Sequence, residues 1–209
     1  MLSSVGLQAK CSKSLHNILI VYFSRHGSVA RMAEDISLGV DSNSACEAIL
    51  RRLPSVSANT EQSESSIPDE GVPFAQQSDL ENCAGLLVGS PGYFGNMAAP
   101  VKYFFDQTSP LWLSGALIGK PGGVFTATSS QHGGQETVLT SMMLPLLHHG
   151  MLVTGIPYSE PALNQTSSGA TPYGASHVAG QQGQALSDHE RSACRALGNR
   201  VADLACKLN

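Results

Sequence analysis

The chain has 209 residues, of which 42% are hydrophobic and 13% charged, and its formal net charge is −4 at pH 7. This composition is that of a globular protein with a substantial core, and the negative charge argues against nucleic acid or an anionic membrane as a partner. No apolar run in the sequence is long enough to span a bilayer.

The cysteines and the start of the chain indicate the compartment. Five widely spaced cysteines form no CxxC pair, which fits reduced thiols in a cytoplasm better than a disulfide framework. The first 16 residues contain Lys10 and Lys13 but no hydrophobic stretch, so they are interpreted as an N-terminal tail and not as a signal peptide. We therefore expect a cytoplasmic protein with one domain over residues 17–209.

Strand-like apolar runs alternate with helical patterns along the chain. The apolar runs cover residues 17–23, 45–51, 85–89, 122–127 and 151–156. The helical patterns cover residues 28–40, 100–107 and 136–149, and a last helix starts after the capping box SDHE, with Ser187 as N-cap.

This alternation predicts the fold. Strands that alternate with helices form an α/β, doubly wound parallel sheet with right-handed crossovers, and five strands favour the flavodoxin-like order 2-1-3-4-5. Three stretches exceed such a minimal sheet and are predicted to be inserted loops: residues 55–77, 109–119 and 157–183.

The first strand joins its helix through SRHGSV, residues 24–29. Ser24 and Ser28 offer hydroxyl groups, Gly27 relaxes the backbone, and the N–H groups at a helix N-terminus suit a phosphate. An ordinary turn with Ser28 as helix cap has the same sequence features, so that alternative stays open. The chain has no Walker loop and no GxGxxG motif after this strand, which argues against a Rossmann dinucleotide site.

Two further loops have the residues that a flat polar ring requires. GSPGYFGNMAAP, residues 89–100, places glycines on both sides of Tyr93 and Phe94, and a Gly-Pro turn with surface aromatics is the alternative. TATSSQHGGQE, residues 126–136, combines hydroxyl groups with a glycine pair before a helix. The loops after strands one, three and four meet at one edge of a flavodoxin-like sheet, so we expect them to form one site.

The histidines do not indicate a metal. His148 and His149 are adjacent on a predicted helix, so they point about 100° apart and cannot chelate one ion together. We expect no metal site. His148 precedes the fifth strand and is expected to face the ligand as the candidate catalytic residue, although the helix dipole alone would also favour a cation there.

Six segments in this order resemble the WrbA family of flavodoxin-like NAD(P)H:quinone oxidoreductases: SRHGSVARMA, GSPGYFGNM, LWLSGALIGKPGGVF, HGGQE, LLHHGM and GATPYGAS. The resemblance covers residues 17–208 apart from most of the 55–77 loop. It implies FMN as cofactor, NADH or NADPH as hydride donor, a quinone as acceptor and a homotetramer in which the inserted stretches build shared walls of the cavity. A one-electron carrier and a flavin-bound regulatory or scaffold protein remain alternatives, although the net charge of only −4 and the insert with Trp112 argue against the carrier.

The resemblance also implies site residues. Its cofactor-binding positions correspond here to Ser24, Arg25, His26, Gly27, Ser28, Val29, Gly92, Tyr93, Phe94, Gly95, Asn96, Ala127, Thr128, Ser129, Ser130, Gln131, His132, Gly133 and His148. Trp112 corresponds to a wall of the substrate cavity, shared with Phe94, and His26 to a contact of the nicotinamide nucleotide. Many members have Thr-Arg where this chain has Gly92-Tyr93, and a glycine where it has His132.

Overall fold

The computed structural model of the protein describes residues 15–57 and 70–208. Most of the predicted tail and much of the predicted 55–77 loop, together with Cys11, lie outside the described residues. The sheet has the order β2-β1-β3-β5-β6, and every pair along this path is parallel. Its strands are β1 (His16–Tyr22), β2 (Cys46–Arg52), β3 (Gly85–Tyr93), β4 (Asn96–Met97), β5 (Pro121–Thr128), β6 (Leu152–Val153) and β7 (Ala175–Val178).

The central strands are buried on both faces, as their sequences predict. All eight residues of β5 are buried, and so are the first six of β3. Continuous apolar runs of this kind form parallel strands because helices cover both faces of the sheet. The predicted order 2-1-3-4-5 is confirmed, with β5 and β6 in the fourth and fifth positions.

Two separate segments build the fifth position of the sheet. The predicted strand over residues 151–156 was too long, because only Leu152 and Val153 pair, with the start of β5. β7 continues the position by pairing with residues 125–128 of β5. The stretch 157–183 is therefore not only an inserted loop, because it carries α6 and a strand of the main sheet.

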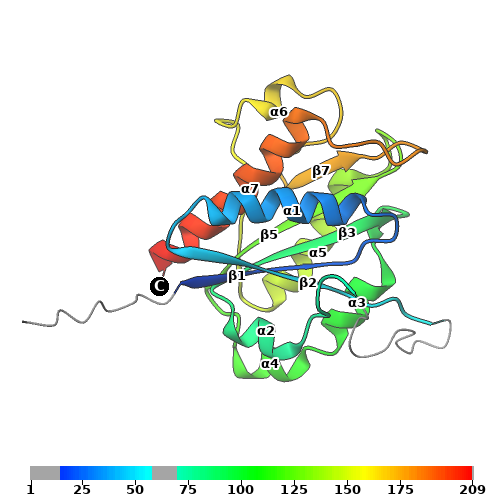
Figure 1. Cartoon of the computed structure of the whole chain (residues 1–209). Coiled ribbons are helices and arrows are strands. Elements are labelled where there is room, and N and C mark those ends of the chain that lie inside the picture. The colour runs from blue at the N-terminus through cyan, green and yellow to red at the C-terminus, as the bar shows by residue number, and fades with distance from the viewer. Residues whose placement is uncertain (1–14, 58–69, 209) are drawn as a thin grey trace, which may run out of the picture.

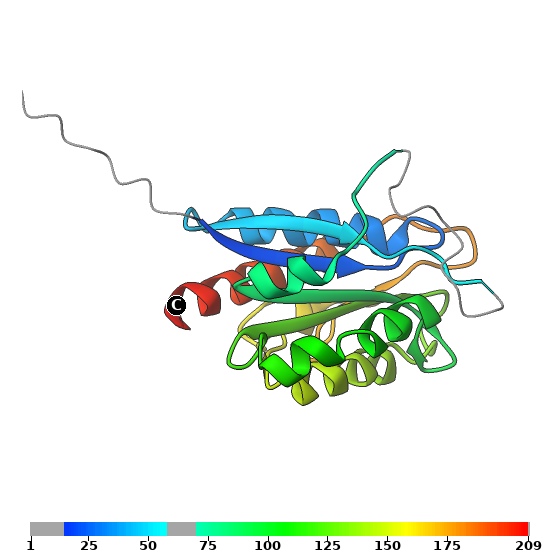
Figure 2. The ribbon, with the colours of Figure 1, turned by 90° about the horizontal axis from the view of Figure 1, so that it is seen from below.

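Helices cover the sheet on two faces (Figures 1 and 2). The helices are α1 (Ser28–Asp41), α2 (Gln77–Asn82), α3 (Ala99–Asp106), α4 (Ser109–Ser114), α5 (Gln135–His148), α6 (Ala162–Gln165) and α7 (Asp188–Leu208). α1 and α7 pack side by side on one face, and α2 to α5 lie on the other. Sequence periodicity predicted α1, α3, α5 and α7 but not the short α2, α4 and α6.

The capping box before α7 is present. The Ser187 hydroxyl accepts the backbone N–H of Glu190 at 3.3 Å, and the Glu190 carboxylate accepts the backbone N–H of Ser187 at 2.8 Å. Over the residues that the structure describes, no helix is both long and apolar enough to cross a membrane. The same residues contain no group of three or more His, Cys, Asp or Glu side chains placed to hold a metal ion.

Candidate cofactor and substrate site

The loop after β1 leaves a row of backbone donors unpaired. Gly27 has φ +85° and is the N-cap of α1, a left-handed conformation that glycine adopts without strain. The Ser24 hydroxyl accepts the backbone N–H of Ala30 at 3.3 Å. Within the described chain, the backbone N–H groups of residues 25–29 have no protein acceptor. Such a row at a helix N-terminus fits an anionic group of a ligand.

Arg31 adds a positive charge to this loop. Its Nη2 donates to the Ser28 hydroxyl at 3.3 Å and to the backbone oxygens of Gly183 and Gln184 at 3.5 and 3.3 Å. Its Nε is buried and has no partner among the described residues. An orphaned buried donor beside free N–H groups fits the phosphate of FMN, because a phosphate oxygen accepts hydrogen bonds from both. Arg31 was not among the site residues predicted from the sequence.

The second loop is a tight hairpin between β3 and β4. Both central residues have positive φ, +50° at Phe94 and +76° at Gly95, as in type I′ hairpins. A bulky residue at positive φ costs roughly 1–2 kcal/mol. The Phe94 ring is nevertheless fully exposed, so burial of its own apolar surface does not repay this strain. Strained and exposed aromatics of this kind mark ligand sites.

Close packing explains the glycine before the hairpin. A Cβ atom at Gly92 would lie 2.9 Å from Cγ2 of Thr128 and 3.1 Å from Cγ2 of Val138. The second and third loops therefore touch through this glycine, as predicted for loops at one edge of the sheet.

The third loop divides between two hollows. Ala127, Thr128 and Ser129 face the first and second loops. Gln131 and His132 instead line a neighbouring polar hollow of about 620 Å³ together with Thr166 and Ser168. The loop turns between these sets because the Thr128 hydroxyl donates to the backbone oxygen of Ser130 at 2.9 Å.

The three loops enclose one cavity, which we call the loop pocket. It measures about 260 Å³, and its walls include these predicted residues: Ser24, Arg25, His26, Ser28, Val29, Gly92, Tyr93, Ala127, Thr128 and Ser129. A second cavity of about 660 Å³, the Phe94 hollow, adjoins it and shares Ser24, Arg25 and Tyr93. The Arg25 guanidinium donates to the Tyr93 hydroxyl at 3.3 Å along their common wall. The larger volume lies in the range of small-molecule sites.

A fourth wall was not predicted from the sequence. Ala179, Gly180, Gln181 and Gly183, in the loop after β7, also line the loop pocket. The glycine pair in GQQG, residues 180–183, was the local signal in the sequence, and both glycines adopt positive φ in the structure. This loop, residues 179–184, follows a strand that joins the sheet beside β5, so it reaches the same edge.

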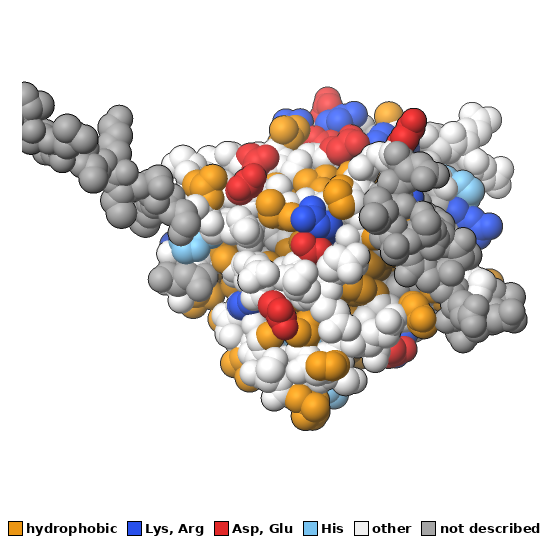
Figure 3. Space-filling view, turned by 60° about the horizontal axis from the view of Figure 1, so that its bottom comes forward, with side chains coloured by type: hydrophobic (Ala, Val, Ile, Leu, Met, Phe, Trp, Pro, Cys, Tyr) orange, Lys and Arg blue, Asp and Glu red, His pale blue; other side chains and the backbone are white. Residues whose placement is uncertain are grey.

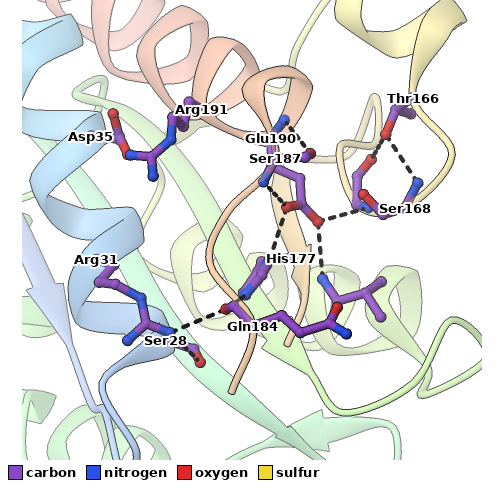
Figure 4. A network of polar contacts seen from close by, with 12 residues as sticks. Ser28, Arg31, Asp35, Thr166, Ser168, His177, Gln184, Ser187, Glu190 and Arg191 are labelled. Atoms are coloured by element: carbon purple, nitrogen blue, oxygen red, sulfur yellow. Dashed lines mark hydrogen bonds and ion pairs between the residues drawn. The ribbon is translucent and has the colours of Figure 1, made fainter. Parts of the chain in front are cut away.

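A buried polar network holds the 179–184 loop in place (Figure 4). The side chain of Glu190 is buried, and its carboxylate accepts hydrogen bonds from the backbone N–H groups of Gly169 and Val178 at 3.0 and 3.1 Å. His177 is also buried, and its Nδ1 lies 3.0 Å from Glu190 Oε2 while its Nε2 lies 3.1 Å from the backbone oxygen of Gln184. Both partners of the ring have oxygen acceptors, so a proton on either ring nitrogen has a hydrogen-bond partner.

The network changes the acidity of Glu190. Burial alone raises the pKa of a carboxyl group, but here the hydrogen bonds from His177, Ser187 and Val178 outweigh it and lower the pKa of Glu190 to about 2. The carboxylate is therefore charged at neutral pH. Its hydrogen bonds connect the start of α7 with residues 169 and 178 and, through His177, with the 179–184 loop.

Trp112 and His148 lie elsewhere in the same chain. The Trp112 Nε1 donates to the backbone oxygen of His148 at 2.9 Å, and the two line a separate hollow of about 400 Å³. The chain that follows His148 lies at the start of β5, since the N–H of Gly119 donates to the backbone oxygen of Gly150 and Leu152 pairs with Pro121. The loop pocket lies at the opposite end of this strand, which is roughly 25 Å long. The expectation that Trp112 and Phe94 wall one pocket, with His148 at the ligand, is therefore not met within a single chain.

An apolar surface surrounds Trp112. Five side chains there are more than half exposed: Trp112, Leu113, Ile118, Leu144 and Leu147. α5 also buries Leu139, Met142 and Leu146 in the core, so it is apolar on two sides. Figure 3 shows several apolar side chains standing out on the face that carries α2, α3 and α4. In its second half, residues 142–147, α5 is apolar on both its buried and its exposed sides, a pattern that fits burial on both sides.

Comparison with known proteins identifies the family. A family model described as NADPH-dependent FMN reductase matches residues 26–161. A NAD(P)H dehydrogenase (quinone) of Gluconacetobacter diazotrophicus is 42% identical over 197 residues, which cover 92% of this chain and 98% of the relative. A protein of the same name from Solidesulfovibrio magneticus is 40% identical over 201 residues, with the same shares covered.

Solved structures show the same fold. The crystal structure of a WrbA-like flavodoxin from Agrobacterium tumefaciens superimposes with a TM-score of 0.64 at 23% identity, and the match covers 93% of this chain and 99% of that one. A flavodoxin from an archaeon has a TM-score of 0.59 at 19% identity, with 91% and 99% covered. These likenesses support the flavodoxin-like architecture, while the family model and the bacterial relatives extend over most of the sequence. The chain belongs to the NADPH-dependent FMN reductase family.

Proposed function

We propose that the protein is an FMN-dependent oxidoreductase that transfers two electrons from NADH or NADPH to quinones, and that it is of the WrbA type within its family. The observation that carries the proposal is the row of N–H groups at residues 25–29 that find no acceptor among the described residues, beside Arg31 and at the edge where the loops meet. The bacterial relatives named NAD(P)H dehydrogenase (quinone) support the choice of donor and acceptor.

The residues of the first loop would hold the FMN phosphate. Ser24 and Ser28 supply hydroxyl groups, residues 25–29 supply backbone donors, and Arg31 supplies the charge. The 92–96 hairpin and the 127–133 loop would hold the ring system, with His26 at the nicotinamide nucleotide. Bound FMN would supply the redox chemistry, by accepting a hydride from the nicotinamide and transferring electrons to the quinone.

Arg25 compensates for a departure from the family pattern. Many WrbA members have an arginine at position 93, where a positive charge would stabilise an anionic reduced ring. Here that position is Tyr93, and the Arg25 guanidinium lies 3.3 Å from its hydroxyl. Arg25 therefore returns a positive charge to the same wall of the loop pocket, and we assign it that electrostatic role.

We propose a homotetramer in which Trp112 and His148 of one copy cover the loop pocket of another. Two observations support this: these residues lie at the far edge of their own sheet, and an apolar surface surrounds Trp112. In this arrangement Trp112 would stack on flat substrates opposite Phe94, and His148 would donate a hydrogen bond to a quinone oxygen. We also propose a cytoplasmic location, which the free cysteines of the described chain support.

Calorimetry with FMN and riboflavin tests the phosphate site. FMN should bind at least about 100-fold more tightly, because charge-assisted hydrogen bonds contribute roughly 1.5–3 kcal/mol each. Arg31→Met should lower the affinity for FMN about 10-fold and leave that for riboflavin unchanged. Lys207→Met, which removes an exposed charge at the end of α7, is the matched control.

Initial-rate kinetics test the shared substrate site. One pocket that serves donor and quinone in turn gives parallel lines in double-reciprocal plots. Equal affinities for FMN and riboflavin would remove the phosphate assignment, and intersecting lines would show that both substrates bind together.

A further inference from the structure

Two cysteines that are far apart in the sequence meet at the edge of the sheet opposite the loop pocket. Cys46 is the first residue of β2, and Cys206 lies in the last turn of α7, 160 positions later. Their Sγ atoms are 3.3 Å apart. Both are free thiols in this structure. The pair takes no part in the proposed flavin site, so its chemistry is independent of that function.

The contact needs little movement to become a bond. A disulfide has an S–S length of about 2.05 Å, so the sulfurs must approach by about 1.3 Å. Only weak contacts hold the thiols: Cys46 Sγ lies 3.6 Å from the Ala202 oxygen, and Cys206 Sγ lies 3.9 Å from Asn43 Oδ1. Cys206 is two residues from the end of α7, where the helix has the fewest restraints.

The two sulfurs differ in their access to solvent. Cys46 is buried, whereas Cys206 is partly exposed. Burial and the contact with Cys206 raise the pKa of the Cys46 thiol to about 12, so Cys46 is a poor first nucleophile. Burial also raises the pKa of Cys83 to about 11 and that of Cys194 well above its ordinary value, and both are buried. Among the four cysteines that the structure describes, an oxidant in solution therefore meets Cys206 first.

We propose that Cys46 and Cys206 form a peroxide-sensitive dithiol that closes to a disulfide between β2 and α7. The Cys206 thiolate attacks hydrogen peroxide, the O–O bond breaks, and the products are a Cys206 sulfenic acid and hydroxide, which takes up a proton to give water. The Cys46 thiol then attacks the sulfenic sulfur, the S–S bond forms, and a second water leaves. In total, two thiols lose two electrons and two protons, and one peroxide becomes two waters.

The disulfide would tie the edge strand to the C-terminal helix. Within the described chain, β2 lies at the edge of the sheet beside β1, and only its last residue, Arg52, also bridges on the other side, to Phe74. The new bond closes a loop of about 160 residues, and long loops give the largest stabilisation in the chain-entropy model. The loop pocket lies at the other end of the strands, so oxidation should change stability and leave flavin binding unchanged.

Peptide mapping after peroxide treatment tests the proposal. Trypsin places the five cysteines in five different peptides, with Cys46 in residues 32–51 and Cys206 in residues 201–207. The full-length protein, treated with one to a few equivalents of hydrogen peroxide, should give these two peptides joined, with a mass about 2 Da below their sum. Dithiothreitol should separate them, and the oxidised protein should melt about 5 °C higher or more.

Two variants decide the result. Cys206→Ser should abolish the joined peptide and the thermal shift, while Cys11→Ser should keep both. Any of three outcomes would overturn the proposal: no joined peptide, oxidation of Cys206 to sulfinic acid without a cross-link, or a cross-link that uses another cysteine or a second chain.

Discussion

Replacing Glu190 by glutamine should destabilise the protein in a way that depends on pH. The carboxylate accepts four hydrogen bonds, from the N–H groups of Gly169, Val178 and Ser187 and from the His177 ring. Glutamine has nearly the same shape, but its NH₂ group replaces one carboxylate oxygen. That group would face the two donors that this oxygen accepted. Two buried donors would then lose their acceptor, and each costs about 1–3 kcal/mol. We expect the free energy of unfolding to fall by about 2–5 kcal/mol at pH 7.

The lowered pKa of Glu190 expresses the effect of the same hydrogen bonds as a dependence of stability on pH. In the folded protein it is about 2, below the ordinary value of 4.5. A depressed pKa stabilises the fold above the unfolded pKa, and this stabilisation disappears as the pH falls from 4.5 towards 2. The full contribution is at most about 3 kcal/mol at pH 7, and about 2 kcal/mol of it should be lost by pH 3.

Urea denaturation of both proteins between pH 7 and pH 3 measures this effect. The difference in unfolding free energy between wild type and Glu190→Gln should narrow by about 2 kcal/mol over that range. Glu47→Gln, which changes an exposed carboxylate on β2, is the matched control and should show no such narrowing. A wild-type advantage of the same size at every pH would refute the reasoning. The affinity for FMN should also fall in Glu190→Gln, because the 179–184 loop loses its anchor.

Two substitutions test the aromatic residues. Phe94→Asn should leave the free energy of unfolding unchanged or raise it by up to about 1 kcal/mol, because asparagine tolerates positive φ. The same variant should lower kcat/KM for quinones about 5-fold or more, because the stacking of the ring is lost. Unchanged kinetics would remove Phe94 from the substrate wall. Trp112→Ala should lower the free energy of unfolding of the single chain by less than about 2 kcal/mol, since the side chain is 54% exposed and loss of a buried tryptophan costs about 3–5 kcal/mol. The variant should form a weaker tetramer in sedimentation experiments and have a lower kcat/KM. Wild-type assembly and kinetics would contradict the proposed tetramer.

The sequence predicted the features that depend on local pattern. Apolar runs located the four longest parallel strands, and helical periodicity located α1, α3, α5 and α7 to within a residue or two at each end. The meeting of three loops followed from strand order alone, because the carboxyl ends of parallel strands share one edge. The structure gives the position of each predicted site residue in the fold, and the roles of these residues in binding remain predictions.

Features that depend on distant contacts escaped prediction. β7 contains the buried polar residues Ser176 and His177, so its sequence is not typical of a core strand, and the partners of the His177 ring, Glu190 and the backbone oxygen of Gln184, lie outside the strand. The position of the 179–184 loop depends on Arg31, 152 positions before Gly183. The contact between Cys46 and Cys206 likewise joins residues 160 positions apart.

The position of His148 within its own chain follows from the topology. It lies at the end of α5, and a helix that follows a parallel strand runs back towards the start of that strand. The topology therefore places His148 away from the loop pocket of its own chain, and strand order alone was sufficient to predict this.

The visible spectrum of the purified protein under anaerobic conditions tests the central claim most directly. We predict a flavin spectrum that bleaches fully when NADH or NADPH is added and returns when a benzoquinone is added, with one donor oxidised per flavin. A protein that binds FMN but is not bleached by either nucleotide, or that once reduced is not reoxidised by quinone, would contradict the account.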